Sequence, residues 1–449
     1  MNVEWAKIYS ILHFFFLFTF LAHIIRTKKS PSSTLAWFFI VAIQPLVGLP
    51  IYFIFGSRKM KPRWFNPRTQ KKLTEVDDSL QSILMLSGSS SAHYNHDIKL
   101  ITTGEIAYQE LMVMIDQAQK SILIETFIFA DDEVGQALLK KLVIKAREGL
   151  EVRVLLDSMG ALMSSHPNFS QLILAGGHFQ KSMPFKLLQG NVNLRNHRKI
   201  VVIDNHLAMA GGMNIALEYM GPTPYEKRWT DLAIRIEGQL VNDLSMMFQE
   251  DWFNATKVKI FSAKEFKFPQ ANEHLAQLVK SGPHELADTI YDWLLSSIYS
   301  AEKRIILSTP YFIPDEALAK ALELAVKRGV KVQIIIPQKS NHAVADLCRS
   351  TYLEQVYNFG VEIYLYPQMI HAKVFLFDHQ RGMVSSANLD NRSMLINDEC
   401  GIILYSGKDI HQLDQWFLEI TQKCSKGLPA KTKLDHWLGG AARLLSPII

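Results

Sequence analysis

Cysteine is scarce in this chain of 449 residues, and neither sign of charge dominates. The three cysteines, Cys348, Cys400 and Cys424, lie far apart and form neither a CxxC pair nor a Cys/His cluster, so no disulfide framework or structural zinc site is expected. The chain has 48 basic and 43 acidic side chains, of which eight basic and one acidic lie in residues 1–65. The remainder is close to a charge of −2. It therefore lacks the broad basic surface that tight nucleic-acid binding needs, and no nucleic-acid partner is expected.

Two long uncharged runs lie near the N-terminus. Ile8–Ile25 has 18 residues and Ser30–Ser57 has 28, with Arg26-Thr27-Lys28-Lys29 between them. At 1.5 Å per residue, each run is long enough to cross about 30 Å of hydrocarbon. We therefore expect a two-helix transmembrane hairpin over residues 1–57, with a cleaved signal peptide as the alternative for the first run. Basic residues at the outer ends of the hairpin favour a multi-pass protein of the cell (inner or plasma) membrane with a cytoplasmic body.

A polar stretch, residues 58–100, reads as a linker with a short helix near Leu80–Leu86. Residues 434–449 combine apolar and basic side chains and form a possible amphipathic tail. This tail is expected either to lie on the bilayer surface or to pack against the body.

Between the linker and the tail, the chain repeats itself. Ser121–Phe129 and Arg304–Phe312 are matching apolar strands, and each is followed by an acidic pair, a helical stretch and another apolar strand. Strand, helix and strand in this order indicate a covered α/β sheet. We therefore expect an α/β fold of two similar halves, residues 101–270 and 271–433, with pseudo-twofold symmetry and a shared site at their seam.

One short motif occurs once in each half. It reads H-x-K-x4-D and is followed, six residues later, by two small residues, one further residue and Asn. The first copy contains His197, Lys199, Asp204 and Asn214, and the second contains His371, Lys373, Asp378 and Asn388. A single H-x-K-x4-D is a weak signal, but two extended copies inside a repeated unit are a strong one.

The spacing of the motif has a physical meaning. Residues two apart on a strand point to the same face, so each half presents an imidazole beside an ammonium group. Across the seam, two lysines neutralise the oxygens of one phosphate and the two Asn side chains donate hydrogen bonds to it. One histidine attacks phosphorus while the other protonates the leaving oxygen. Because the lysines supply the positive charge that a metal would bring, neither a metal nor another cofactor is expected.

Both motif copies, the apolar run Leu49–Gly56, and the segments Trp229–Asp231 and Phe248–Trp252 resemble the phospholipase D superfamily, and within it the bacterial cardiolipin synthases. The resemblance covers nearly the whole chain. It implies transfer of a phosphatidyl group from one phosphatidylglycerol to the hydroxyl of another, giving cardiolipin and glycerol through a phosphohistidine at the membrane.

The same resemblance implies individual roles. His197 is the nucleophile, and His371 is the acid and base. Asp204 and Asp378 belong to the catalytic motif, although in this superfamily they are more often structural. Asp231 and Glu399 match the carboxylates that orient the histidines, and we expect them to act crosswise, Glu399 on His197 and Asp231 on His371.

Three alternatives remain open. The same histidine pair accepts water, which would make the protein a phospholipase D-type phosphodiester hydrolase that releases phosphatidic acid, or a nuclease. A phosphatidyltransferase with another donor lipid is the second alternative, and a non-enzymatic membrane scaffold is the third. The expected hairpin and the near-neutral body argue against a nuclease. Whether the chain forms an oligomer is left open.

Overall fold

The computed structural model describes residues 3–27, 31–56, 79–183, 193–260, 266, 268–269, 271, 273–285 and 287–430. The chain divides into two compact units, and each is considered by itself. One comprises Met1–Met60 with Pro184–Asn193, and the other comprises Lys61–Met183 with Leu194–Ile449. Most of the predicted linker before residue 79 and the predicted tail 434–449 lie outside the described residues.

The N-terminal unit is helical, but its second uncharged run is interrupted. Its helices are α1 (Val3–Arg26), α2 (Pro31–Ile43) and α3 (Pro45–Phe55). Gln44 separates α2 from α3 because the proline that follows it disfavours a helical conformation at the preceding residue. No helix in the described part of the chain combines the length and the apolar character that crossing a bilayer requires. The transmembrane hairpin predicted over residues 1–57 is therefore not supported.

The same unit has a small core and a large apolar surface. Phe20, Ile24, Val41 and Tyr52 form the core, and the rings of Tyr52 and Phe20 lie 5.0 Å apart. Much of the rest stays exposed, including Phe14 at 72% and Leu46 at 89% of their accessible surface. Such a contiguous apolar surface is typical of a site that contacts lipid or another protein.

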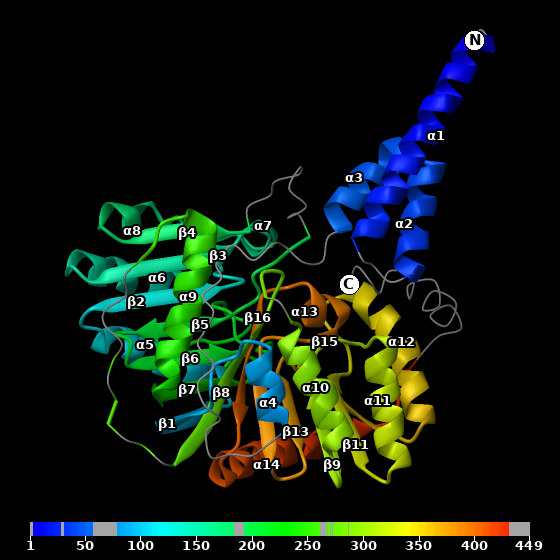
Figure 1. Ribbon diagram of the computed structural model, residues 1–449. Helices are drawn as coiled ribbons and strands as arrows, with labels where there is room; N and C mark the ends of the chain where they lie inside the picture. Colours follow the sequence, from blue (N-terminus) through cyan, green and yellow to red (C-terminus); the bar gives the residue numbers. More distant parts are fainter. Residues whose placement is uncertain are drawn as a thin grey trace. The chain divides into compact units, whose positions relative to one another are not determined.

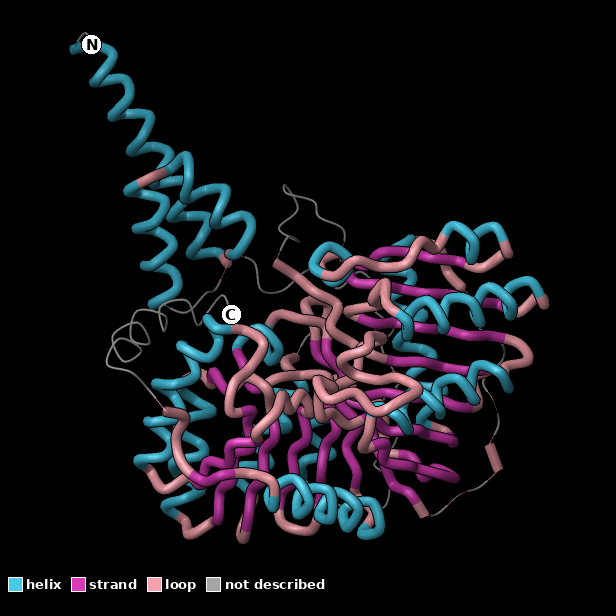
Figure 2. Tube along the Cα trace, turned by 180° about the vertical axis from the view of Figure 1, so that it is seen from behind, coloured by secondary structure: helices cyan, strands magenta, loops and turns pink. Residues whose placement is uncertain are grey.

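The larger unit is built on one sheet of fifteen strands (Figures 1 and 2). Its first seven strands are β1 (His93–Ile101), β2 (Ser121–Thr126), β3 (Glu151–Asp157), β4 (His178–Ser182), β5 (Ile200–Ile203), β6 (Leu207–Gly211) and β7 (Ala233–Gly238). The others are β8 (His274–Ser281), β9 (Arg304–Ser308), β11 (Lys331–Pro337), β12 (Glu362–Tyr366), β13 (Lys373–Phe377), β14 (Arg381–Ser385), β16 (Glu399–Leu404) and the edge strand β17 (Ser425–Lys426). A separate parallel pair is formed by β10 (Phe312–Ile313) and β15 (Leu389–Asp390).

Strand order shows the duplication directly. From the centre outward, the first half runs β1-β7-β6-β5-β2-β3-β4 and the second runs β8-β16-β14-β13-β9-β11-β12. The halves join through the antiparallel pair β1 and β8. The expected α/β fold of two similar halves is thus confirmed, and each motif strand, β5 or β13, occupies the same place in its half.

Helices cover both faces of this sheet. The first half contains α5 (Gly104–Gln117), α6 (Glu133–Arg147), α7 (Gly160–Met163), α8 (Ser170–Leu174) and α9 (Leu240–Thr256). The second contains α10 (Thr289–Ser300), α11 (Glu316–Lys327), α12 (Ala343–Asn358), α13 (Asn391–Leu395) and α14 (Gly407–Gln422). On one face, α9 and α14 share a single core that runs across both halves, whereas α5, α6 and α8 on the other face pack in a core separate from that of α10, α11 and α12.

The linker prediction for residues 58–100 needs one correction. The short helix expected there is present as α4 (Ser79–Leu86), but residues 93–100 belong to β1 at the centre of the sheet. This strand carries His93, Asn95 and His96 among its apolar residues, so its sequence reads as a polar stretch. Pairing with β7 and β8 on either side orders it nevertheless.

Candidate active site

Each histidine segment forms a short bridge to the carboxylate segment of the other half. The backbone N–H of His197 donates to the carbonyl of Asp398 at 2.8 Å, and that of His371 donates to Thr230 at 2.7 Å. The residue after each acceptor is a carboxylate, Glu399 or Asp231. The seam therefore carries the crosswise pairing in its backbone before any side chain takes part.

The side chains complete the crossing. Nδ1 of His197 lies 3.0 Å from Oε1 of Glu399, and Nδ1 of His371 lies 2.7 Å from Oδ2 of Asp231. Both carboxylate side chains are fully buried, whereas the His197 ring is 13% exposed. A carboxylate on Nδ1 fixes the tautomer of an imidazole and leaves Nε2 for chemistry.

The two lysines of the motif lie at the same end of their strands as the histidines. Lys199 directly precedes β5 and Lys373 opens β13, and both are almost completely buried. Each ammonium donates to the backbone carbonyl of its own histidine at 2.5 Å, and Nζ of Lys373 lies 2.8 Å from Nε2 of His371. The structure therefore brings together two imidazoles, two ammonium groups and two carboxylates at one seam.

Burial and like charge shift the basic groups. Burial lowers the pKa of His371 to about 3, with a further contribution from Lys373, and lowers that of His197 well below its ordinary value in the same way. Burial also lowers the pKa of Lys199 to about 8 and that of Lys373 to about 7. A bound phosphate anion would reverse these shifts, because its negative charge favours the protonated forms.

The two carboxylates are not equivalent. Burial raises the pKa of Glu399 to about 7, against the opposing effects of Lys199 and a hydrogen bond from Ser386. Burial acts on Asp231 in the same direction, but the neighbouring His371 outweighs it and lowers the pKa of Asp231. At neutral pH, His371 therefore faces an ionised carboxylate, whereas Glu399 beside His197 is close to its titration midpoint.

Asn214 and Asn388 are both buried in the turns that follow their motif strands. Oδ1 of Asn214 accepts a hydrogen bond from the backbone N–H of Ile128 at 3.2 Å. Oδ1 of Asn388 has no hydrogen-bond partner within the described residues. The phosphate-binding role expected for this pair stays a prediction.

Asp204 and Asp378 lie at the far end of β5 and β13, in turns. Both adopt left-handed backbone conformations, with φ of 54° and 52°. Asp204 accepts hydrogen bonds from three consecutive backbone N–H groups, those of Gln119, Lys120 and Ser121, and Asp378 accepts three from Glu302, Lys303 and Arg304. These contacts tie each motif strand to the start of its neighbour, β2 or β9.

Sequence reasoning gave the two small residues of the motif no individual roles. The Oγ of Ser386 donates to Oε2 of Glu399 at 2.5 Å. At the matching position of the first half, a Cβ on Gly212 would lie 2.3 Å from Oδ1 of Asp231. One half thus uses a hydroxyl to hold its carboxylate, and the other uses a missing side chain to make room for one. The unequal pairs, Gly-Gly and Ser-Ser, were the only signal in the sequence.

Aromatic rings pack around the histidines, which the sequence also left unassigned. Phe127 lies 5.1 Å from the His197 ring, measured between centroids. Tyr219 and Trp229 lie 5.1 and 5.5 Å from the His371 ring. These contacts limit rotation of both imidazoles and exclude water from their faces.

Behind His197 lies a buried ionic network. Arg198 is 2% exposed, pairs with Asp251 on α9 and lies 3.6 Å from Asp398 of the second half. It also donates to the backbone carbonyl of Glu399 at 3.3 Å. Removing one partner of such a buried pair is strongly destabilising, so Arg198 helps to hold the two halves in register.

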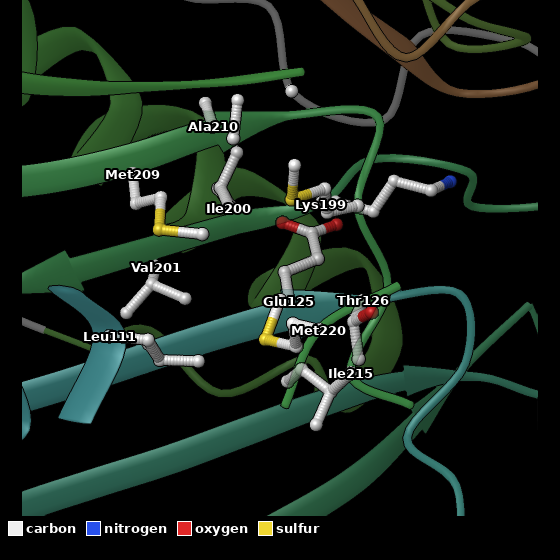
Figure 3. A pocket seen from close by; sticks show the side chains of 13 residues that line it. Leu111, Glu125, Thr126, Lys199, Ile200, Val201, Met209, Ala210, Ile215 and Met220 are labelled. Atoms are coloured by element: carbon white, nitrogen blue, oxygen red, sulfur yellow. The ribbon is translucent and has the colours of Figure 1, made fainter. Parts of the chain in front are cut away.

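A small cavity extends from this region between the sheet and its helices (Figure 3). Glu125 and Thr126 lie at one end with the stem of Lys199, while the ammonium of Lys199 points away from the Glu125 carboxylate. Most of the lining is apolar, including Met209 and Val201. The cavity lies beneath the lysine and carries none of the histidines.

Within the described ranges, no three His, Cys, Asp or Glu side chains come close enough together to hold a metal ion. The acid-base groups at the seam are instead paired with one another, as histidine with carboxylate. Together they can bind a phosphate, donate and accept its protons, and offer an imidazole nitrogen as a nucleophile.

The site and fold are those of known proteins. A family model described as "Cardiolipin synthase, PLD-like domain" matches residues 111–252 and 294–421, and one described as "Phospholipase_D-nuclease N-terminal" matches residues 15–57. A cardiolipin synthase of Clostridium perfringens (strain SM101) is 33% identical over 427 residues, covering 89% of this chain and 90% of its own. Cardiolipin synthase 1 of Bacillus cereus is 31% identical over 424 residues, covering 87% and 83%.

Among solved structures, a phosphatidylserine synthase from Haemophilus influenzae superposes with a TM-score of 0.64 at 16% identity. The match covers 83% of this chain and 100% of that one. At this level of identity the likeness establishes the duplicated fold.

Proposed function

Because the chain belongs to the cardiolipin synthase family of phospholipase D-like proteins, we propose that it transfers a phosphatidyl group from one phosphatidylglycerol to another and yields cardiolipin and glycerol. The observation that carries the proposal is the seam itself, where each histidine is held by a buried carboxylate of the other half and lies beside a buried lysine. Such a site needs both halves to act.

In the first step, a donor phosphate lies between Lys199 and Lys373, which neutralise its nonbridging oxygens. Nε2 of His197 attacks phosphorus, and the bond from phosphorus to the glycerol oxygen breaks. His371 gives its proton to that oxygen, so free glycerol leaves and a phosphatidyl group remains on His197. The incoming anion raises the pKa of His371 from its low value in the empty site, which allows it to carry this proton.

The second step reverses the first with a new alcohol. A hydroxyl of the second phosphatidylglycerol gives its proton to His371, and its oxygen attacks phosphorus. The bond from phosphorus to Nε2 of His197 breaks, and cardiolipin leaves. In this account Asp231 and Glu399 orient the rings, Asn214 and Asn388 contact the phosphate, and Asp204 and Asp378 hold the motif strands in place.

We also place the protein at the cell membrane, with phosphatidylglycerol as its lipid substrate. The exposed apolar side chains of the N-terminal helices support contact with a bilayer, where the substrate is concentrated. This contact requires no particular number of membrane crossings.

The test is direct. Purified full-length protein in detergent is incubated with phosphatidylglycerol, with and without a chelator, and the lipids are separated. Equal amounts of cardiolipin and glycerol, in both conditions and absent from the His197→Ala protein, support the proposal. Phosphatidic acid as the main product would instead identify a hydrolase.

A further inference from the structure

The two sides of the seam are pseudo-symmetric in backbone but not in charge. Arg195 precedes His197 by two positions, and its carbonyl accepts from the N–H of Asp398 at 2.8 Å. The matching residue before His371 is Met369, whose carbonyl accepts from Thr230 at 2.9 Å. An arginine in one half thus takes the place of an apolar residue in the other.

A second arginine lies on the same side. Arg392 on α13 follows Asn388 by four positions, and the residue four positions after Asn214 is Glu218. The carbonyl of Arg392 accepts from the N–H of Asn397 at 3.0 Å, directly before the Asp398 that bridges to the Arg195–His197 segment. Both arginines are half-buried. The His197 side is therefore basic, whereas Tyr219 and Trp229 pack on the other histidine.

The guanidinium groups act on each other and on the site. Burial and then the charge of Arg392 lower the pKa of Arg195 to about 10. The charge of Arg392 also contributes to the low pKa of His197. Holding two like charges together in a half-buried site is unfavourable unless an anion offsets them.

Two carboxylates lie near these arginines, but backbone groups already occupy much of their capacity. Oδ1 of Asp157 accepts from the N–H groups of Met159 and Gly160 at 2.8 and 3.0 Å, and its Oδ2 accepts from Asn196 at 2.8 Å. Asp390 caps α13 and accepts from the N–H of Ser393 at 2.7 Å. Both are buried.

We propose that Arg195 and Arg392 form a second anion subsite beside the reacting one, which binds the phosphate of the acceptor lipid. The inference rests on the proposed function, in which two phosphodiesters, each with one negative charge, must occupy the site together. The lysine pair neutralises the phosphate that reacts, and the arginine pair binds the one that does not. Guanidinium groups suit this task because they bind phosphate oxygens in a bidentate manner.

This subsite has a specific consequence for acceptor choice. A neutral alcohol lacks the second phosphate and gains nothing from the arginines. Glycerol is such an alcohol, and its exchange into phosphatidylglycerol uses the same donor, the same phosphohistidine and the same acid and base. Cardiolipin formation and glycerol exchange therefore differ only in the acceptor.

The experiment compares the two reactions in one preparation of full-length protein in mixed detergent micelles. Labelled glycerol reports exchange, and labelled phosphatidylglycerol reports cardiolipin. In Arg195→Gln and Arg392→Gln, the ratio of cardiolipin formation to glycerol exchange should fall about tenfold or more, as expected for a lost charge-assisted contact. Arg392→Lys should recover part of the ratio, and Arg235→Gln, on β7 and paired with Asp97, should leave it unaltered.

Glycerol exchange also shows that each variant is folded, and the lysine variants replace any glutamine variant that lacks both activities. An unchanged ratio, whether both rates fall together or neither falls, would overturn the subsite. Failure of the proposed function looks different, because the unmodified protein would then form no cardiolipin at all.

Discussion

Nδ1 of His197 lies 3.0 Å from Oε1 of Glu399, although 202 positions separate the two residues in the chain. Asp231 and His371 form the reciprocal pair at 2.7 Å. Neither half therefore contains a complete histidine and carboxylate unit of its own. The duplication produces one site, and the crossing makes that site depend on both halves being folded and joined.

The carboxylates are expected to act through the histidines. Glu399→Gln and Asp231→Asn preserve side-chain size but remove the charge that orients each imidazole, so kcat for cardiolipin formation should fall about 100-fold or more. Thermal unfolding of each variant serves as the control for folding. A loss of less than threefold in a folded variant would show that the histidines are oriented by other groups.

The pH dependence should show a limb on the alkaline side. Burial lowers the pKa of Lys373 to about 7, so as pH rises through this value the free enzyme loses a positive charge that attracts the phosphodiester, and kcat/KM falls. In Lys373→Arg the guanidinium stays charged, and the limb should move up toward the titration of Lys199 near 8.

The measurement is kcat/KM for cardiolipin formation from pH 5 to 10, and Lys141→Arg, a surface residue paired with Asp116, is the matched control. An identical alkaline limb in Lys373→Arg and the unmodified protein would contradict the assignment.

The motif aspartates should affect stability more than chemistry. Asp378→Ala removes the acceptor of three backbone N–H groups in a turn, and each buried donor left unpaired costs about 1–3 kcal/mol. The melting temperature should therefore fall, while kcat of the protein that remains folded stays within threefold of normal. If a fully folded Asp378→Ala protein is inactive, this carboxylate takes part in the reaction.

The N-terminal helices should supply encounter with the lipid. A chain lacking residues 1–56 should lose synthesis on phosphatidylglycerol vesicles far more than turnover of a short-chain lipid dispersed in detergent. Vesicle flotation measures the binding lost by the same deletion. Equal loss in both assays by a folded deletion protein would place these helices inside the catalytic machinery.

Much of the site could be predicted from the sequence because its chemistry is local. His197 and Lys199 stand two positions apart on a strand, and the second copy repeats the spacing. The partner Glu399 became a candidate only through the family resemblance, because no local pattern connects it to His197. The contact from Ser386 to Glu399 depends on two segments that meet only in the folded protein, so the motif showed no more than a small residue.

The errors also have local causes. Ser30–Ser57 is uncharged throughout, and its length alone suggested a membrane helix, but Pro45 divides it at Gln44. Strand β1 carries polar residues at several positions and was assigned to the linker, yet β7 and β8 pair with it from both sides. In both cases hydropathy was a weaker guide than backbone hydrogen bonding.

The central claim is that a single covalent intermediate forms on His197. Full-length protein is mixed with phosphatidylglycerol labelled in its phosphatidyl group, quenched within milliseconds and digested, and the labelled peptide is identified by mass spectrometry. We expect the label on the peptide that contains His197, its loss in His197→Ala, and its retention in His371→Ala when the donor carries a leaving group that needs no proton. Label on His371, or undiminished label in His197→Ala, would contradict the account.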